Sequence, residues 1–264
     1  MKQRIITGLI LLAIILPGIF YLSSLGFKII ATLIIACAAW EYFGFFVDKI
    51  GLRVSFLIGL LAISFAAIQI VPAQPILMLA GLWWIIAPYF LWHYTQKECH
   101  SFNNIITQSL VGLIIFVPCL IGMVEIYEDF GIGYLLYVLA IVWAADIGAY
   151  FTGLRFGKNL LGAKISPKKT IEGLIGGIVA ALLVATIGGF LLHFTGIRWL
   201  FILTLAVIVC LWSVIGDLFE SMLKRQAGVK DSGVILPGHG GVYDRIDSLT
   251  AAIPLFALGL LILS

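Results

Sequence analysis

The residues best suited to chemistry in this 264-residue chain lie between positions 216 and 247. This stretch is the one long polar interruption in a mostly apolar sequence, and it holds four of the sixteen basic residues and five of the thirteen acids. Asp217, Ser221 and Lys224 are spaced i, i+4 and i+7, so they share one face if the preceding helix continues through them. The spacing therefore predicts a carboxylate, a hydroxyl and an ammonium group that lie side by side.

The second half of this stretch combines a loop with two further acids. Residues 237–241, PGHGG, cannot be helical, because glycine frees the backbone and proline removes a hydrogen-bond donor. Asp244 and Asp247 follow at a spacing of i, i+3, which places both carboxylates on one side of the first turn of the last apolar helix. Acids, bases and glycines together indicate a metal and phosphate site at a membrane surface.

A second polar segment precedes it in the chain. Asp146 lies near the end of an apolar span, and an acid inside a membrane is a candidate functional residue by default. The following run from Ser166 to Thr170, SPKKT, places hydroxyls and two lysines just ahead of a helix start, where backbone N–H groups and the helix dipole favour anions. The alternative interpretations are a structural ion pair at Asp146 and a capped helix with ordinary membrane-flanking lysines.

The composition identifies the elements that must position these groups. Apolar residues make up 62% of the chain, charged residues 11%, and the mean hydropathy is +1.15. Soluble domains carry about a quarter charged residues, so we predict an all-α, polytopic membrane bundle. Apolar runs long enough to cross the bilayer predict nine transmembrane helices, near residues 5–25, 29–47, 54–71, 75–92, 105–124, 131–151, 171–192, 197–219 and 246–263.

The orientation follows from the excess of Lys and Arg in cytoplasmic loops. With a cytoplasmic N-terminus and nine crossings, only Lys28 and Arg198 fall outside, and fourteen of the sixteen basic residues lie on the cytoplasmic side. We therefore expect a multi-pass membrane protein with a cytoplasmic N-terminus. We divide it into packing helices over residues 1–125 and a catalytic region over 126–264, with cytoplasmic loops at 152–170 and 220–245.

The first half offers few chemical groups. Glu41 is the exception, because a carboxylate within a span costs roughly 2.5–3.5 kcal/mol and needs a partner or an aqueous pocket. Its interpretation stays open between helix packing, snorkelling to the interface and function. The four cysteines are scattered singly, which indicates neither a disulfide framework nor a metal site.

The motifs from residue 143 onward resemble one enzyme family. The pattern S-x-L-K-R-x4-K-D-x-G-x2-L-P-x-H-G-G-V-x-D-R-I-D, from Ser221 to Asp247, is similar at every defined position to that of phosphatidate cytidylyltransferases, also called CDP-diacylglycerol synthases. Two further motifs, W-x2-D-x2-A-Y-x2-G ending at Gly153 and S-P-K-K-T-x-E-G ending at Gly173, resemble the same family. The chain departs from it at Leu154, where the family often has a basic residue.

The resemblance implies transfer of a cytidylyl group from CTP to phosphatidate, giving CDP-diacylglycerol and pyrophosphate, with Mg²⁺ and a second cation such as K⁺. It also implies a homodimer in the inner membrane of a bacterial cell, in contact with membrane lipid, and we expect no nucleic-acid partner. The cytoplasmic face suits the reaction, because both CTP and the lipid head group are available there.

The resemblance and the chemistry of the side chains together assign roles. The predicted catalytic residues are Asp217, Lys224, Arg225, Lys230, His239 and Arg245. The predicted substrate-binding residues are Ser166, Lys168, Lys169, Thr170, Ser221, Gly240 and Gly241. The carboxylates of Asp217, Asp244 and Asp247 are hard ligands of the kind Mg²⁺ prefers, and Asp146 and Asp231 are further candidates. Asp231 alternatively pairs with Lys230, and His239 serves better as a donor to phosphate than as a base.

Three rival functions are weighed against this prediction. A secondary transporter would show paired halves with matching interruptions, which the sequence lacks. Another transferase acting on CDP-activated lipids or polyprenyl phosphates would not match the full motif. A structural scaffold would not need carboxylates and lysines near the ends of five spans.

Overall fold

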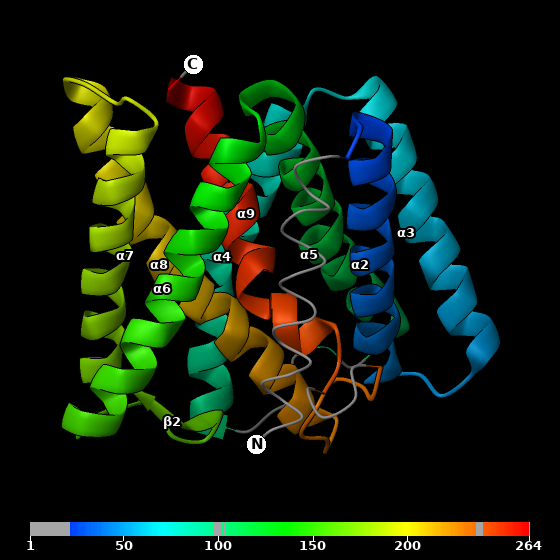
Figure 1. The fold of residues 1–264 in the computed structure, drawn as a ribbon. Coiled ribbons are helices and arrows are strands. Elements are labelled where there is room, and N and C mark those ends of the chain that lie inside the picture. The colour runs from blue at the N-terminus through cyan, green and yellow to red at the C-terminus, as the bar shows by residue number, and fades with distance from the viewer. Residues whose placement is uncertain (1–21, 98–101, 103, 236–239, 264) are drawn as a thin grey trace.

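The computed structural model describes residues 22–97, 102, 104–235 and 240–263 of the chain (Figure 1). Its helices are α2 (Ser24–Gly44), α3 (Ile50–Ile70), α4 (Ala73–Lys97), α5 (Ile105–Glu125), the π-helix η1 (Ile126–Phe130), α6 (Ile132–Phe156), α7 (Ile171–Leu191), α8 (Ile197–Gln226) and α9 (Tyr243–Leu263). Two short strands, β1 (Leu160–Gly162) and β2 (Ser166–Thr170), complete the described elements.

The fold is an all-α polytopic membrane bundle, as the sequence predicts. Among the described residues, eight helices are long and apolar enough to cross a membrane, and they correspond to the last eight predicted spans. Residues 5–21 of the first predicted span lie outside the described part of the chain. Helices α5 and α9 are the most buried of the eight and form the centre of the bundle.

Local sequence explains where several helices begin and end. The side chains of Ser23, Asn104 and Thr170 accept hydrogen bonds from the backbone N–H groups of the first turns of α2, α5 and α7. Helix α8 ends where Gly228 adopts the left-handed conformation, with a φ of 71°. There the N–H of Val229 bonds to the carbonyl of Lys224 at 2.9 Å, which satisfies an exposed helix carbonyl.

Four predicted boundaries are wrong by five or more residues: α2 begins at Ser24 instead of residue 29, α4 ends at Lys97 instead of residue 92, and the ends of α8 and α6 are also displaced. Helix α8 continues to Gln226, beyond the predicted end at residue 219, so the following loop spans only residues 227–242. Helix α6 continues to Phe156, beyond the predicted end at 151. In both cases polar residues lower the hydropathy of the last turns without interrupting the helix.

The connection from α6 to α7 contains an antiparallel hairpin of β1 and β2, which the sequence did not predict. Leu160 pairs with Thr170 and Gly162 pairs with Ser166. Figure 1 shows this hairpin and the connection from α8 to α9 at the same end of the bundle. The two polar segments that the sequence predicts to act together therefore lie at one end of the molecule.

Close helix contacts bring the chemical groups of these segments together. Helix α6 packs tightly on α7 through small residues: a Cβ added at Gly148 would lie 2.6 Å from the Cβ of Ala180 and 2.8 Å from the carbonyl oxygen of Gly176. Helix α8 packs on α9 in the same way, because a Cβ added at Gly216 would lie 2.7 Å from the carbonyl oxygen of Asp247. Small residues at such contacts let membrane helices approach closely.

Candidate active site

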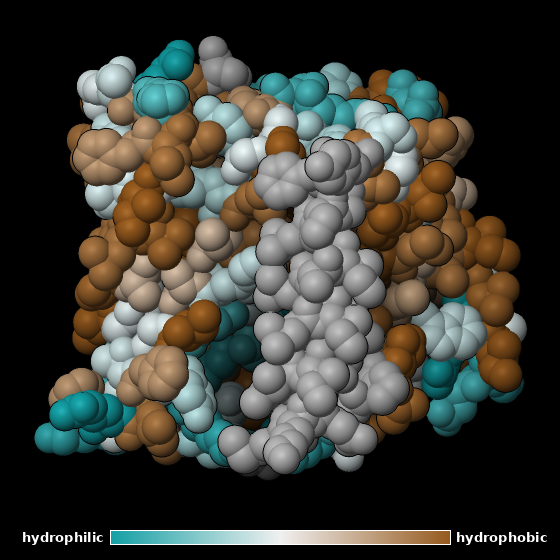
Figure 2. Space-filling model, viewed as in Figure 1, coloured by the Kyte–Doolittle hydropathy of each residue, from teal (hydrophilic) through white to brown (hydrophobic). Residues whose placement is uncertain are grey.

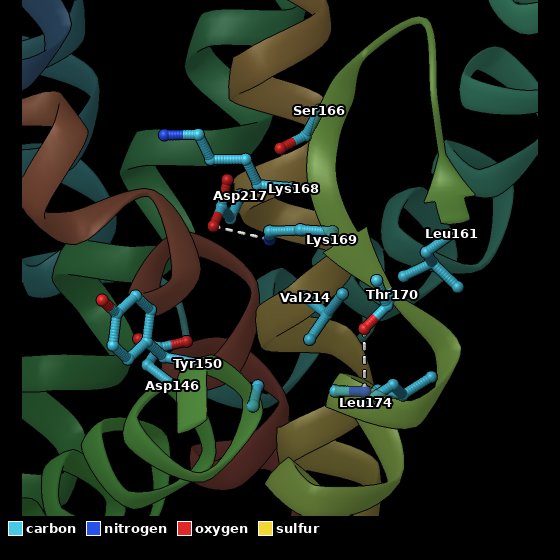
Figure 3. Close-up of a pocket in the computed structure, with 12 residues that line it drawn as sticks. Asp146, Tyr150, Leu161, Ser166, Lys168, Lys169, Thr170, Leu174, Val214 and Asp217 are labelled. Carbon is cyan, nitrogen blue, oxygen red and sulfur yellow. Dashed lines mark hydrogen bonds and ion pairs between the residues drawn. The ribbon is translucent and has the colours of Figure 1, made fainter. Parts of the chain in front are cut away.

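A polar cavity of about 300 Å³ opens where α6, the hairpin, α7 and α8 meet. Its polar lining comes from Asp146, Tyr150, Ser166, Lys168, Lys169, Thr170 and Asp217 (Figure 3). Figure 2 shows a hydrophilic recess in the lower half of an otherwise largely hydrophobic face, beside α6. The cavity brings together groups from the two polar segments of the sequence.

An ion pair joins these segments across the cavity. The Lys169 Nζ lies 2.5 Å from Oδ2 of Asp217, and both side chains are about a quarter exposed, at 24% and 28%. On α8, the hydroxyl of Ser221 donates to Oδ1 of Asp217 at 3.3 Å. The predicted spacing of Asp217 and Ser221 on one helix face is therefore confirmed.

Two further carboxylates face this ion pair. Asp146 of α6 interacts electrostatically with Asp217 and Lys169. Asp247 of α9 interacts with Asp217, Lys169 and Asp146, and its Oδ1 accepts hydrogen bonds from the N–H and the hydroxyl of Ser248. Among these described residues, three carboxylates thus interact electrostatically with one ammonium group, which only Asp217 contacts directly, so the four groups carry a net negative charge when all are ionised.

A second cluster is centred on Lys224. Its Nζ lies 2.5 Å from Oε2 of Glu220, one turn earlier on α8, and 2.6 Å from Oδ1 of Asp244 on α9. The Glu220 side chain is fully buried. Lys224 therefore links the last turns of α8 to the first turn of α9, and its ammonium group compensates the charge of a buried acid.

Asp244 organises the loop between these helices. Its Oδ2 accepts hydrogen bonds from the N–H of Ser232 at 2.9 Å and of Gly241 at 2.8 Å, while Oδ1 binds Lys224. Gly240 has a φ of 82°, and a Cβ there would lie 2.7 Å from the Asp244 carboxylate. Both oxygens of Asp244 are engaged within the protein, and its role as a metal ligand stays a prediction.

Glu41 is buried against the same loop, with an exposed fraction of 6%. Its Oε2 accepts hydrogen bonds from the hydroxyl of Ser232 at 3.0 Å and from the N–H of Tyr243 at 2.8 Å. A Cβ at Gly233 or Gly241 would lie within 2.4 Å of its carboxylate oxygens. The sequence left Glu41 open between helix packing, snorkelling and function, and these contacts show a different role, in which a residue from the first half of the chain anchors the loop.

The hairpin is fixed to its neighbours by three groups. The Thr170 hydroxyl caps α7 by accepting from the N–H of Gly173 at 3.1 Å. The Glu172 carboxylate accepts from the N–H groups of Lys158 and Asn159, at 3.0 and 3.2 Å, and from the Asn159 amide at 2.7 Å. Arg225 Nε donates to the carbonyl of Ile165 at 3.3 Å, which ties the hairpin turn to the end of α8.

The remaining predicted site residues fall into three groups. Lys168 and Ser166 line the polar cavity, and Lys168 is exposed. Lys230, Asp231 and Arg245 are exposed around the loop from α8 to α9. His239 lies outside the described residues, so its predicted role as a phosphate donor stays a prediction.

Sequence reasoning missed Glu220 and Glu172. Glu220 could have been found from its spacing, because an acid four residues before Lys224 on a helix forms an i, i+4 pair. Glu172 caps a turn of irregular backbone, and no periodic pattern marks such a contact. Glu41 was noticed but could not be placed, because its partners lie near the other end of the chain.

The carboxylates suit a divalent cation by their chemistry. Asp146, Asp217 and Asp247 offer hard oxygen atoms beside a single ammonium group, and such oxygens are the ligands of Mg²⁺. In the described part of the chain, no three His, Cys, Asp or Glu side chains are already arranged around a metal position. The donor set fits Mg²⁺, and its coordination geometry is not pre-formed.

Comparison with known proteins places this chain in a family. A profile of the Cytidylyltransferase family matches residues 2–263. The phosphatidate cytidylyltransferase of Pseudomonas aeruginosa is 39% identical over 262 residues, which cover 97% of this chain and 96% of the relative. Proteins of the same name from Haemophilus influenzae and Bacillus subtilis are each 34% identical, covering 97% and 96% of this chain and 97% and 95% of the relatives. The chain therefore belongs to the cytidylyltransferase family and is a nucleotidyltransferase.

Proposed function

We propose that this protein transfers the cytidylyl group of CTP to phosphatidate, giving CDP-diacylglycerol and pyrophosphate. The observation that carries the proposal is the polar cavity between membrane-spanning helices, where Lys168 and Lys169 lie beside Asp146 and Asp217. A soluble nucleotide can reach such a cavity from the aqueous end of the bundle, and a lipid can reach it from the side. The names of the relatives support the same pair of substrates.

The reaction exchanges one phosphoanhydride bond for another. An oxygen of the lipid phosphate attacks the α-phosphorus of CTP, and a new P–O bond forms. The bond from that phosphorus to the β,γ-diphosphate breaks, and its electron pair leaves with pyrophosphate. A phosphate monoester with a second pKa of about 6 is mostly dianionic at neutral pH, so the lipid needs no general base.

The side chains act mainly on charge and position. CTP and phosphatidate repel one another, and positively charged groups are needed to hold both in one site. Lys168 and Lys169 supply ammonium groups, and the N-terminus of α7 adds the positive end of a helix dipole. The ion pair with Asp217 holds Lys169 directed into the cavity.

We infer that Asp146, Asp217 and Asp247 would hold Mg²⁺, because they are the carboxylates that share one ammonium group. When bound, Mg²⁺ neutralises charge on the phosphate oxygens and on the departing pyrophosphate. Treatment with EDTA should abolish turnover, and MnCl₂ or MgCl₂ should restore it. A second cation such as K⁺ and the homodimer remain expectations from the family resemblance.

We further propose that the cavity faces the cytoplasm of a bacterial cell, across the inner membrane. The hairpin and the loop after α8 lie at one end of the bundle, and nine of the sixteen basic residues lie in or directly beside them, five within residues 155–170 and four within 224–245. Cysteines introduced at Lys158 and Arg198, at opposite ends, give the test. A membrane-impermeant thiol reagent added to intact spheroplasts should label position 198 and leave position 158 unlabelled, and the reverse pattern contradicts this orientation.

The activity itself is tested with purified protein in lipid nanodiscs. CTP labelled at the α-phosphate, phosphatidate and MgCl₂ should give CDP-diacylglycerol and pyrophosphate in equal amounts. Omission of phosphatidate should remove both products. Absence of both products in the complete mixture, with folded protein and several phosphatidates, would end the proposal.

A further inference from the structure

A second cavity, of about 440 Å³, lies between α4, the hairpin and α8. Its lining is almost entirely apolar and includes Leu91 and Trp92 of α4, Gly162 and Ile165 of the hairpin, and Leu211 and Ile215 of α8. Charged residues line the polar cavity, whereas none lines this one among the described residues. The molecule thus has an apolar space beside its charged one.

The two cavities share part of their walls. Leu161 of β1, Leu174 of α7 and Val214 of α8 line both. Figure 3 shows these three side chains on the side of Lys169 that faces away from Asp146 and Tyr150. The two cavities are therefore adjacent, and a molecule whose charged end lies beside Lys169 would have its apolar end next to the second cavity.

We propose that the apolar cavity holds an acyl chain of the lipid whose phosphate occupies the polar cavity. This inference rests on the proposed function, because it takes phosphatidate as the lipid. The shared wall of the two cavities favours this occupant over a second copy of the chain, because a lipid has both the charged group and the apolar chain that the adjacent cavities suit. Bulk membrane lipid is the remaining alternative, and the test below separates it.

Such a cavity affects where the lipid is held more than how tightly the lipid binds. Lipid tails are as apolar as the side chains of the wall, so an acyl chain gains little hydrophobic free energy by moving from the bilayer into the protein. A chain held between α4 and α8 restricts where the glycerol phosphate lies, and this restriction orients the attacking oxygen toward the nucleotide. The cavity should therefore affect kcat/KM for lipids whose chains are long enough to reach it.

Gly162 offers a way to fill the cavity gradually. A Cβ at this position would lie 3.8 Å from Cδ2 of Leu218 and 4.0 Å from the Cβ of Ile165, both ordinary contacts with side chains of the cavity wall. Its φ lies outside the left-handed region, so larger residues fit the backbone. Gly162→Ala, Gly162→Val and Gly162→Phe therefore form a series of increasing volume, and Leu211→Phe fills the same space from α8.

The experiment compares phosphatidates with six-carbon and sixteen-carbon acyl chains in nanodiscs. For each variant, kcat/KM is measured for both lipids and KM for CTP is measured alongside. We expect Gly162→Phe and Leu211→Phe to lower the ratio of long-chain to short-chain kcat/KM by at least about tenfold, with Gly162→Ala and Gly162→Val in between. Short-chain turnover and the KM for CTP should stay within twofold of the unmodified protein.

Ile85→Phe is the matched control, because Ile85 lies on α4 outside the cavity and is 65% exposed. It should leave the ratio unchanged. An unchanged ratio in the Gly162 and Leu211 variants, with activity retained, would assign the cavity to bulk lipid and overturn the inference while the proposed function stands. Equal loss for both chain lengths in both filled variants would also overturn it. No product from any phosphatidate with the unmodified protein would instead refute the proposed function.

Discussion

The ion pair between Lys169 and Asp217 sets the electrostatics of the polar cavity, because it joins a base and an acid of the cavity wall at 2.5 Å. Asp146 and Asp247 face the same ammonium group. One ammonium group compensates only part of the charge of three acids. This incomplete compensation explains why the cavity can attract a cation as well as anionic substrates.

The first prediction concerns these acids. Asp217→Asn and Asp247→Asn should each lower kcat by at least about a hundredfold, because each removes charge that would bind the divalent cation without changing side-chain size. Size-exclusion profiles and thermal unfolding should remain near those of the unmodified protein. Near-normal rates in both variants would contradict the metal assignment. Glu128→Gln is the control. Glu128 is also an acid in an ion pair, but its partner Lys28 lies near the start of α2, at the opposite end of that helix from Glu41 and the loop that Glu41 contacts.

Asp244→Asn should behave differently from the other two aspartates. Its carboxylate is engaged by Lys224, Ser232 and Gly241, so the variant weakens the loop and leaves Lys224 with one acidic partner. We expect proteolysis within residues 227–242 to accelerate in this variant, and in Ser232→Ala to a lesser degree. Protection equal to that of Asp217→Asn would show that Asp244 does not organise the loop.

Glu41 is predicted to act as a positioning residue for the same loop. Glu41→Gln keeps an oxygen that can accept from Tyr243 N–H, so it should retain more activity than Glu41→Ala. Both variants should have a lower kcat than the unmodified protein, with a nearly unchanged thermal transition. Glu41→Ala combined with Ser232→Ala should cost less than the sum of the single effects, because both variants remove the same hydrogen bond. Strict additivity in this cycle would indicate that Glu41 serves helix packing alone.

The sequence predicts individual side chains well where helical spacing controls them. Asp217 and Ser221 share a face because a helix repeats every 3.6 residues, and Thr170 caps a helix because its position precedes an apolar run. The pairing of Lys169 with Asp217, or of Glu41 with Ser232, depends on how distant segments pack. No local pattern encodes such contacts, so they became visible only in the structure.

At the scale of elements, the contact of α8 with α9 aligns the carboxylates of two helices. Gly216 lets the backbones approach until its Cα faces the carbonyl of Asp247 and the Cβ of Ala251. Gly216, which precedes Asp217 in the polar motif, is thus a packing residue. Asp217 takes its position opposite Asp247 from this contact.

Gly216→Ala should therefore impair catalysis through helix separation. An added Cβ would lie 2.7 Å from the carbonyl oxygen of Asp247, so α8 must shift, and overpacking of this kind costs about 1–3 kcal/mol of unfolding free energy. We expect a lower melting temperature and a lower kcat, measured by thermal unfolding and product formation. Gly59→Ala on α3 is the control, because nothing lies within 4 Å of its added Cβ. Equal effects of the two substitutions would refute the argument.

The elements also show the limits of hydropathy as a guide. Apolar runs locate the last eight spans, because crossing the bilayer demands a long apolar helix. The hairpin of β1 and β2 was not predicted, since SPKKT lacks both alternation and β-branched residues other than Thr170. The apolar cavity was equally hidden, because its wall residues cannot be distinguished by composition from residues that face lipid.

At the scale of the whole molecule, the two predicted regions do not act separately. Glu41 from residues 1–125 holds the loop that follows α8, and Trp212 of α8 donates its indole N–H to the carbonyl of Trp84 at 3.0 Å. Helix α5 also packs against α9 at the centre of the bundle. Contacts therefore join the residues on the two sides of the predicted division at residue 125.

This arrangement predicts the behaviour of a divided protein. Residues 126–264 expressed alone should insert into the membrane but show no turnover, because the loop lacks its anchor. Coexpression with residues 1–125 should restore activity in part, and a first fragment carrying Glu41→Ala should restore less. Full activity of the second fragment alone would contradict a contribution from the first half.

Helix α8 has 30 residues, and at 1.5 Å per residue it measures about 45 Å, against roughly 30 Å for the hydrocarbon of a bilayer. It runs obliquely through the bundle (Figure 1). A helix that is longer than the hydrocarbon thickness changes its tilt when the bilayer becomes thicker or thinner. Turnover in vesicles of graded lipid chain length, at constant surface charge, measures this coupling. We expect turnover to change with bilayer thickness, because the tilt of α8 would set the depth of Asp217 in the membrane.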